Sequence, residues 1–381
     1  MNNFVFTNLT SAQIEKELLS LNEVPGLDVL NMDRRLLRLC ATIIAPSLSY
    51  IFNQSLVDGV VPTDFKLARV TPVYKNGEDC DISNHSDYRP ISVICHIAKI
   101  FERLVKNQLL TFLNANDLLS HDQSGYLKDH STQTSLHRVI EDWLENINEG
   151  EFTGACIFDI SKCFDTINHR HLLFKLDKYG IRGDAQNWFK SYLSDRRQVV
   201  SLHNTLSSEK NLNFGVPQGS LLGPFLFLLF INDIQNFSTN GCVINLFADD
   251  LILYCSSKCL NELQRRLQSA VNSICDWYKR NRLKVNPKKS KLMVIGTPSQ
   301  ISLVNKDNFK ISYDGSDIPL VREAKYLGLT ITSDLSWDKH ISSLCRGLMY
   351  KISVLRQLQK SGALSDLVAS YLLYGIYFIE N

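Results

Sequence analysis

Apolar residues recur every three or four positions over much of this chain, a spacing typical of helices with one buried face. In the segment 132–148, for example, Leu136, Val139 and Trp143 fall on one side. The segment 221–234 is apolar almost all round, but its longest apolar run is only about half the length of a membrane span, so we expect a buried helix there. Helices are predicted at residues 11–58, 95–113, 132–148, 168–180, 185–194, 221–234, 259–282 and 340–381.

Shorter apolar runs, several of them bounded by turn-forming residues, predict strands. Two such runs flank a polar turn at 76–81 and predict a β-hairpin with basic residues near its ends. The run at 154–158 is apolar without alternation, which is typical of a strand buried on both faces. Strands are predicted at residues 67–75, 88–93, 154–158, 291–296 and 325–332, with a pair in 196–214 and another in 245–254.

Two adjacent acids, Asp249 and Asp250, interrupt the pair of strands predicted around 245–254. The pattern predicts strand, tight turn, strand, with both carboxylates at the tip. Two carboxylates about 4 Å apart repel by roughly 1 kcal/mol in water and about 4 kcal/mol at an effective dielectric of 20. A cation between them would remove that repulsion. An isolated Asp-Asp pair is more often a plain turn, because turns favour aspartate.

A third acid changes that interpretation. Asp159 follows the strand predicted at 154–158, where a charge is costly unless it is paired or bound to a metal. The three acids can converge if their strands are neighbours in one sheet. Carboxylate oxygens suit Mg²⁺, which keeps waters and accepts substrate phosphates as further ligands. Two such ions can stabilise the attacking and leaving oxygens of a phosphoryl transfer.

Composition narrows the class of protein only slightly. The 381 residues are 44% hydrophobic and 21% charged, which predicts a globular chain with two or three packed subdomains. The net charge of +2 is too small to identify a partner. A local basic tract is either a solvated face or a phosphate-binding surface. Its residues are Lys279, Arg280, Arg282, Lys284, Lys288, Lys289 and Lys291.

The cysteines and the first residues of the chain bear on its location. Ten cysteines without a Cys-x-x-Cys spacing favour reduced thiols over a disulfide framework or a zinc ribbon. No export signal is visible at the N-terminus. The sequence therefore predicts an intracellular protein of the nucleus or cytoplasm, neither secreted nor bound to a membrane.

Seven short motifs occur in a fixed order along the chain. They are Ala68-Arg69-Val70-Thr71-Pro72-Val73-Tyr74-Lys75, Tyr88-Arg89-Pro90-Ile91-Ser92, Phe158-Asp159-Ile160-Ser161-Lys162-Cys163-Phe164-Asp165, Gly215-Val216-Pro217-Gln218-Gly219-Ser220-Leu221-Leu222-Gly223-Pro224, Phe247-Ala248-Asp249-Asp250, Leu283-Lys284-Val285-Asn286-Pro287-Lys288-Lys289-Ser290 and Tyr326-Leu327-Gly328. Through these motifs the chain resembles the reverse transcriptases of non-LTR (LINE-like) retrotransposons, over roughly residues 10–350. One motif alone would be weak evidence, whereas seven in order are specific.

The resemblance implies an α+β fold of the right-hand polymerase type, with fingers, a palm built on an antiparallel sheet, and a partial helical thumb. It divides the chain into a helical N-terminal segment at 1–55, the fingers and palm at 56–332, and a truncated thumb at 333–381. It implies an RNA-directed DNA polymerase that extends a primer 3′-OH with dNTPs, on an RNA template and a DNA primer. Two Mg²⁺ ions, replaceable by Mn²⁺, would serve as cofactors.

The resemblance also assigns site residues. Asp159 and Asp249 would be the principal metal ligands and catalytic acids, with Asp250 supporting them and Ile160 lending its carbonyl. The aromatic ring of Phe164 would exclude a 2′-hydroxyl, although ordinary core packing is the alternative for this residue. The remaining assignments are triphosphate neutralisation by Lys75 and Arg89, nucleotide and template contact by Gln218 and Gly219, pyrophosphate protonation by Lys289, and primer contact by Tyr326, Leu327 and Gly328.

The chain also departs from such elements. Cys163 stands where many relatives carry alanine, a small-for-small exchange. No endonuclease is expected before residue 10 and no Cys/His knuckle after the polymerase motifs. The alternative is therefore a truncated remnant that binds nucleic acid without polymerising. An unrelated helical protein would require Asp249-Asp250 to be a plain turn. Template preference, target site and oligomeric state are left open by the sequence.

Overall fold

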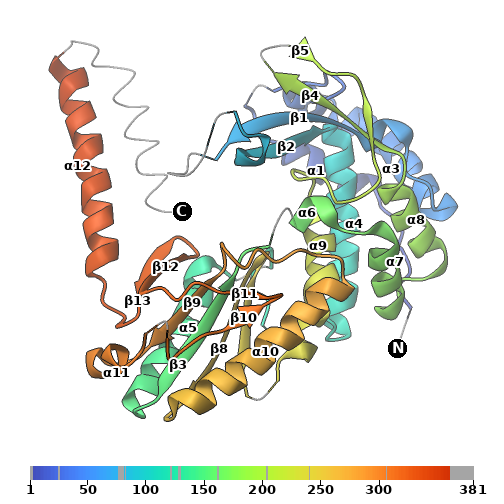
Figure 1. The fold of residues 1–381 in the computed structure, drawn as a ribbon. Helices are drawn as coiled ribbons and strands as arrows, with labels where there is room; N and C mark the ends of the chain where they lie inside the picture. The colour runs from blue at the N-terminus through green and yellow to red at the C-terminus, as the bar shows by residue number, and fades with distance from the viewer. Residues whose placement is uncertain are drawn as a thin grey trace.

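The structure is a computed structural model that describes residues 3–24, 26–75, 81, 83–120, 122–127, 130–160, 163–202, 205–239, 241–305 and 307–360. A four-stranded sheet with its helices forms one lobe, and a helical lobe with a second sheet stands beside it (Figure 1). A long helix, α12 (Asp338–Lys360), extends away from the rest of the chain. The fold is therefore α+β, as predicted.

The first lobe is built on a fully antiparallel sheet. Its strands are β3 (Phe152–Phe158), β7 (Val243–Phe247), β8 (Asp250–Ser257) and β9 (Lys291–Ile295), in the order β7-β8-β3-β9. Each adjacent pair of strands runs antiparallel. The two central strands, β3 and β8, carry the sequence that leads to Asp159 and the sequence that follows Asp249.

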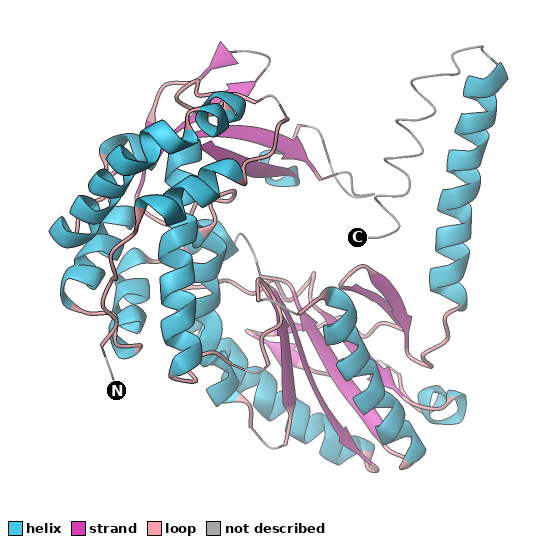
Figure 2. Cartoon of the chain, turned by 180° about the vertical axis from the view of Figure 1, so that it is seen from behind, coloured by secondary structure: helices cyan, strands magenta, loops and turns pink. Residues whose placement is uncertain are grey.

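Helices cover both faces of this sheet, as the view from behind also shows (Figure 2). The helix α10 (Leu260–Arg280) packs on the face that presents Cys156 and Leu253. The helix α5 (Thr132–Asn148) packs on the other face, through Trp143 and neighbouring apolar residues. Because β3 is covered on both sides, its sequence is a continuous apolar run, which confirms the prediction of a doubly buried strand.

The second lobe combines helices with a mixed sheet. Its strands are β1 (Leu67–Tyr74), β2 (Tyr88–Ile94), β4 (Arg196–Leu202), β5 (Thr205–Leu206) and β6 (Lys210–Leu212). The order is β2-β1-β4-β5, and β6 also pairs with β4; only β1 and β4 run parallel. The predicted basic hairpin is therefore confirmed as β1 and β2. Residues 76–80 of its predicted turn lie outside the described residues.

Aromatic packing holds the helices of this lobe together. The rings of Phe52 and Phe101 stack with centroids 4.3 Å apart, and Trp188 meets Phe101 edge to face at 5.4 Å. Such pairs add to the free energy of burial because ring edges and faces carry opposite partial charge. These rings come from α3 (Ala41–Asp58), α4 (His96–Ala115) and α8 (Gly183–Leu193). The lobe also contains α1 (Ser11–Leu19), α2 (Arg34–Leu39) and α7 (His169–Lys178).

A buried helix connects the two lobes. In α9 (Leu222–Ile231), every residue except Pro224 is buried, which confirms the interpretation of this apolar run as a core helix. The short helix α6 (Cys163–Thr166) packs beside it, and a 3-10 helix (Asn232–Phe237) continues it. Within the described part of the chain, no helix is long and apolar enough to cross a membrane.

One sequence prediction needs correction. The strand predicted at 325–332 is a hairpin of β12 (Glu323–Tyr326) and β13 (Leu329–Thr332), because Leu327 and Gly328 adopt positive φ and reverse the chain. The helical segment predicted at 11–58 is confirmed, and it consists of the three helices α1 to α3.

The C-terminal elements were predicted only in part. The prediction of a helix from residue 340 is confirmed as far as Lys360, and residues 361–381 lie outside the described part. Three short elements were not predicted: β10 (Ser312–Tyr313), β11 (Ser316–Asp317) and α11 (Pro298–Ser302). The predicted domain limits at 55 and 332 stay predictions.

The packing of α10 on the sheet gives a stability prediction. Leu267 is fully buried, and its side chain lies against Gly154 of β3. We expect Leu267→Ala to lower the free energy of unfolding by about 2–5 kcal/mol, because it leaves a cavity under the sheet. Urea unfolding would measure this. The matched change Leu303→Ala, at a leucine that is 63% exposed, should cost about 0.5 kcal/mol or less. Equal losses in the two variants would contradict this account of the core.

Candidate active site

A cavity of about 970 Å³ lies between the sheet that contains β1, β2 and β4 and the end of β3 where the chain leaves the four-stranded sheet. One wall carries the acidic side chains of Asp159, Asp249 and Asp250. The opposite wall, from β1 and β2, carries the cations Lys75 and Arg89. Acids thus face bases across a space wide enough for a ligand with several charges.

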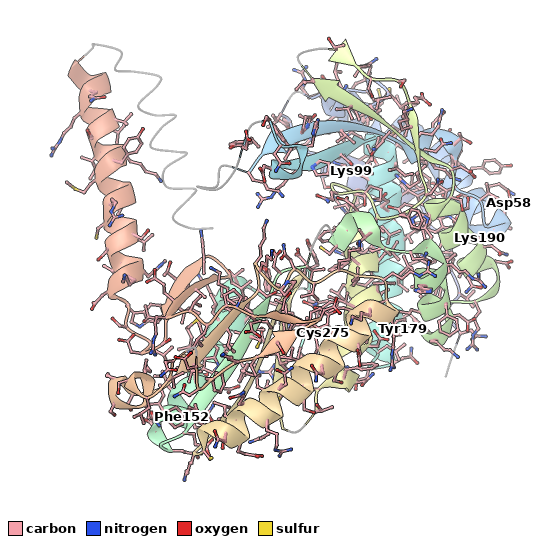
Figure 3. All side chains as sticks on the ribbon, in the orientation of Figure 1. Asp58, Lys99, Phe152, Tyr179, Lys190 and Cys275 are labelled. Carbon is pink, nitrogen blue, oxygen red and sulfur yellow. The ribbon has the colours of Figure 1, made fainter. Side chains whose placement is uncertain are left out.

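Asp159 owes its position to the strand that precedes it. It follows the last residue of β3, at the opposite end of that strand from Phe152, which is labelled in Figure 3. Its backbone N–H donates to Ser290 Oγ (3.1 Å), and its carbonyl accepts from the N–H of Asn286 (2.9 Å). Ile160 continues this contact through a β-bridge to Val285. The motif around residues 285–290 therefore clamps the backbone on both sides of the Asp159 side chain.

The register of β3 and β8 brings the next acid alongside. Phe158 lies opposite Leu251, so Asp159 and Asp250 are the next residues on the two strands. The turn itself consists of Ala248 and Asp249, and Asp250 is the first residue of β8. The prediction that both carboxylates sit at the tip is thus correct for Asp249, whereas Asp250 belongs to the strand.

A loop from the region before α5 supports this turn. Ala248 has a φ of +55°, which costs energy for a residue with a side chain. The buried Gln123 holds it there, because Gln123 Oε1 accepts from the N–H groups of Ala248 (3.0 Å) and Gly125 (2.6 Å). A Cβ added to Gly125 would lie 2.2 Å from the Ala248 nitrogen. Only glycine fits at this approach.

Burial and like charge both disfavour ionisation in the acidic wall. Burial, together with the charges of the nearby Asp249 and Asp159, raises the pKa of Asp250 to about 6. Burial likewise raises the pKa of the Cys163 thiol, which donates to Asp249 Oδ2 (3.3 Å). The acids therefore repel one another. A bound cation would lower that repulsion.

The carboxylates of this cavity suit a divalent cation that keeps part of its water shell better than one enclosed entirely by protein ligands. Among the residues that the structure describes, no group of three His, Cys, Asp or Glu side chains is arranged as a ready metal cage. Magnesium does not require one, since it commonly takes one or two carboxylates and completes its shell with water and substrate phosphates. The carboxylates of this cavity fit that second pattern.

Phe164 lies on the floor of the cavity, on α6. Its ring centroid is 4.5 Å from that of Phe227 on α9 and 6.4 Å from that of Tyr126. Burial, together with the charge of Asp249, raises the pKa of Tyr126 to about 12, which places this phenol beside the acids. Phe164 is thus both packed from behind and in contact with the cavity, so the two alternatives for it are not exclusive.

Gln218 reaches the cavity from the loop before α9. Its Nε2 donates to Asp165 Oδ1 (3.0 Å), and its carbonyl accepts from the N–H of Ser92 on β2 (2.6 Å). Gly219 does not line the cavity. Its φ is +121°, and an added Cβ would lie 2.2 Å from the Ser92 carbonyl oxygen. The contact that requires this glycine is the backbone of β2.

Four other predicted site residues lie outside the cavity lining. Lys289 is exposed in the turn that clamps Asp159. Tyr326 is buried, and its hydroxyl donates to Asn245 Oδ1 (3.3 Å) on β7. Leu327 and Gly328 form the turn between β12 and β13. The β12–β13 hairpin is therefore attached to the strand that leads to the acids rather than to the cavity itself.

Some residues of the basic tract have partners within the protein. Lys279 pairs with Asp314 (3.2 Å), and Arg280 lies over the ring of Phe237. Lys289 lies in the turn beside Asp159, as described above. Phosphate binding by the tract stays a prediction.

Sequence reasoning missed the residues that support the acids from behind. Gln123 and Gly125 precede α5 in a polar stretch with no periodicity, and Tyr126 follows them. A glycine beside polar residues was the one signal there, and it did not reveal which backbone approaches it. Asn286 and Ser290 belonged to a motif that was noted, but not for their contacts with Asp159.

Comparison with known proteins agrees with this geometry. A family model described as Reverse transcriptase (RNA-dependent DNA polymerase) matches residues 74–331, which is more than half of the chain and includes all three acids. The chain belongs to the reverse transcriptase family. The resemblance inferred from the seven motifs is thereby confirmed.

The relatives are proteins of retrotransposons. A probable RNA-directed DNA polymerase from transposon BS of Drosophila melanogaster is 30% identical, over 93% of this chain and 39% of its own length. The RNA-directed DNA polymerase from mobile element jockey of Drosophila funebris is 29% identical, over 90% and 37%. The chain thus spans less than half the length of these relatives. A solved structure of apo telomerase from Candida tropicalis is similar over 78% of the present chain and 60% of the telomerase chain, at 15% sequence identity and a TM-score of 0.48.

The raised pKa of Asp250 predicts a pH dependence of stability. The pKa is about 6 in the folded chain, against an ordinary value of 3.8, so the folded state binds more protons between these values. The free energy of unfolding of metal-free protein should therefore fall as pH rises from about 4 to about 6. Urea unfolding in a chelating buffer would measure it. Asp250→Asn should remove this component, and the exposed Asp317→Asn should retain it. Parallel pH curves for the wild type and Asp250→Asn would contradict the assignment.

Proposed function

We propose that this chain is an RNA-directed DNA polymerase of a retrotransposon, which extends a primer 3′-OH with dNTPs on an RNA template. The observation that carries the proposal is the single cavity in which Asp159, Asp249 and Asp250 face Lys75 and Arg89. A dNTP is a polyanion, and it reaches a carboxylate-lined site only when cations offset its charge. The names of the relatives support the choice of RNA as template and DNA as product.

The acids have the proposed role of metal ligands. Asp159 and Asp249 would hold two Mg²⁺ ions, for which Mn²⁺ can substitute, with Asp250 and the carbonyl of Ile160 in support. The bound ions would supply charge stabilisation to the attacking and leaving oxygens. The clamp of residues 285–290 and the Gln123 contact keep the carboxylates in place before substrate arrives, which lowers the reorganisation that the reaction would otherwise require.

The other wall has the proposed role of nucleotide binding. Lys75 and Arg89 neutralise the triphosphate, and Gln218 contacts the incoming nucleotide, with Gly219 allowing its loop to approach β2. Phe164 has the proposed role of excluding a ribose 2′-hydroxyl with its rigid ring, which packs against Phe227. The packing behind it is what makes exclusion effective, because a ring that cannot retreat cannot make room.

Two assignments involve residues outside the cavity lining. Lys289 is the proposed proton donor to leaving pyrophosphate, and it belongs to the turn that holds Asp159. Tyr326, Leu327 and Gly328 are proposed to contact the primer end, from a hairpin attached to β7 through Asn245.

Primer extension on an RNA template tests the acids. We expect Asp249→Ala to reduce extension at least about a thousand-fold, because it removes a ligand that stabilises charge in the transition state. Asp276→Ala, at an exposed acid on α10 outside the cavity, should extend as the wild type does. Purified wild-type protein that binds a primer–template but never extends it would overturn the proposal and favour a binding-only remnant.

Sugar discrimination tests Phe164. We expect Phe164→Val to raise the incorporation of ribonucleotides relative to deoxyribonucleotides by roughly 10- to 100-fold, because the smaller side chain frees space beside the 2′ position. Phe164→Tyr keeps the ring and should keep the discrimination. The measurement is the ratio of kcat/KM for matched ribonucleotide and deoxyribonucleotide substrates. An unchanged ratio in Phe164→Val would leave this ring a packing residue only.

A further inference from the structure

A buried carboxylate outside the cavity holds the start of α9. Glu102, in the interior of α4, is 3% exposed. Its Oε2 accepts from the backbone N–H of Leu221 (2.7 Å) and Leu222 (3.3 Å), and its Oε1 accepts from Tyr192 Oη (2.8 Å). A charge so far from solvent is costly unless donors satisfy it, so these three donors define what Glu102 is able to do.

The first N–H groups of α9 cannot use water as their hydrogen-bond acceptor in place of Glu102. The first N–H groups of any helix have no partner within the helix, and α9 is buried along its length. Glu102 satisfies Leu222, Ser220 Oγ accepts from Gly223 (2.9 Å), and Pro224 has no N–H to satisfy. A negative charge at this end of the helix is also attracted to the positive end of the helix dipole. The N-terminus of α9 is therefore fixed from α4.

The loop that carries Gln218 ends at this point. Val216 N–H donates to the carbonyl of Phe164 (2.8 Å), and the Gln218 carbonyl accepts from Ser92 on β2. These contacts fix the early and middle parts of the loop at residues 215–220. Its last anchor before α9 is Glu102, through Leu221. Loss of that anchor would free the loop at the end next to the helix while leaving its other contacts formed.

A cation on β4 accompanies Glu102. Arg196 is 1% exposed, lies over the Tyr192 ring at 4.8 Å, and donates through Nη1 to the Tyr192 carbonyl (3.1 Å). Burial raises the pKa of Glu102, and the charge of Arg196 lowers it. Because β4 pairs with β1, and β1 with β2, the sheet that carries Lys75 and Arg89 is connected to the same group. Figure 3 labels Lys99, one turn before Glu102 on α4.

We propose that Glu102 is a positioning residue for the incoming nucleotide, acting through α9 and the loop 215–220 to set the place of Gln218 relative to the cationic wall. The proposal rests on the proposed polymerase function, because it assigns a nucleotide contact to Gln218. Glu102 lies outside the cavity and is expected to contact neither the substrate nor the three aspartates of the acidic wall. Its effect should therefore appear in nucleotide binding rather than in the chemical step.

Steady-state kinetics of primer extension would show this effect. We expect Glu102→Gln, which keeps the size of the side chain, to raise KM for dNTP about tenfold with kcat nearly unchanged, because binding energy is lost equally from the ground and transition states. Tyr192→Phe removes one donor and leaves both amide contacts, so its KM should change by less than that of Glu102→Gln.

A matched control separates positioning from general loss of stability. Ser55→Ala removes two other hydrogen bonds of the same lobe without touching α9. Ser55 Oγ accepts from Trp188 Nε1 (3.1 Å) and donates to the Val60 carbonyl (2.6 Å). This substitution should lower the melting temperature and leave KM for dNTP at the wild-type value. An equal rise of KM in Ser55→Ala and Glu102→Gln would overturn the proposal, and so would an unchanged KM in Glu102→Gln.

Amide hydrogen exchange tests the contact without any activity. In Glu102→Gln, exchange should accelerate in the segment containing the loop 215–220 and Leu221 and Leu222, and in Ser55→Ala it should not. Unchanged exchange at these amides in Glu102→Gln would overturn the proposal. If the wild type fails to extend primers, the proposed function fails, while the exchange measurement still decides whether Glu102 fixes this loop.

Discussion

The antiparallel register between β3 and β8 is the constraint on which the candidate active site depends. It places Asp159 beside Asp250, and a two-residue turn then adds Asp249. A slip of one residue would turn alternate side chains to the opposite face and separate the acids. The register is strongly specified because both faces of the sheet are buried, by α10 on one side and α5 on the other. The apolar core on the two faces of the sheet therefore supplies the stability that offsets the mutual repulsion of the acids.

Strain and repulsion are concentrated at the same place. Ala248 keeps a left-handed backbone next to Asp249, and the Gln123 side chain holds it there. Asp250 has a raised pKa because it is buried beside Asp249 and Asp159. Each feature costs stability in the isolated chain, and each is what a site for a cation and a polyphosphate requires. Preorganised carboxylates bind such a ligand without first having to move.

The sequence was sufficient for the parts that local pattern determines. The doubly buried run before Asp159 and the paired apolar arms around Asp249 predicted the strands, and convergence of the acids followed from their placing. Prediction from the sequence failed where the contact that fixes a residue comes from a distant part of the chain. The strand predicted at 325–332 is a hairpin because Gly328 reverses it, and Gly219 is required by the backbone of β2. Gln123 and Glu102 act on residues about 120 positions away, and no local spacing reveals such partners.

Buried charge in this fold lies where α4, α8, β4 and the start of α9 meet. Replacing a buried ion pair as a whole by apolar groups of similar volume is often neutral for stability, so stability alone does not account for Glu102 together with Arg196. A carboxylate differs from an apolar group because its hydrogen-bond donors must lie at defined positions. Glu102 takes those donors from α9 and α8, and Arg196 brings in β4. The geometry of the loop before α9 is thereby tied to the sheet that forms the cationic wall, so the two sides of the cavity that would meet a nucleotide are set by one network.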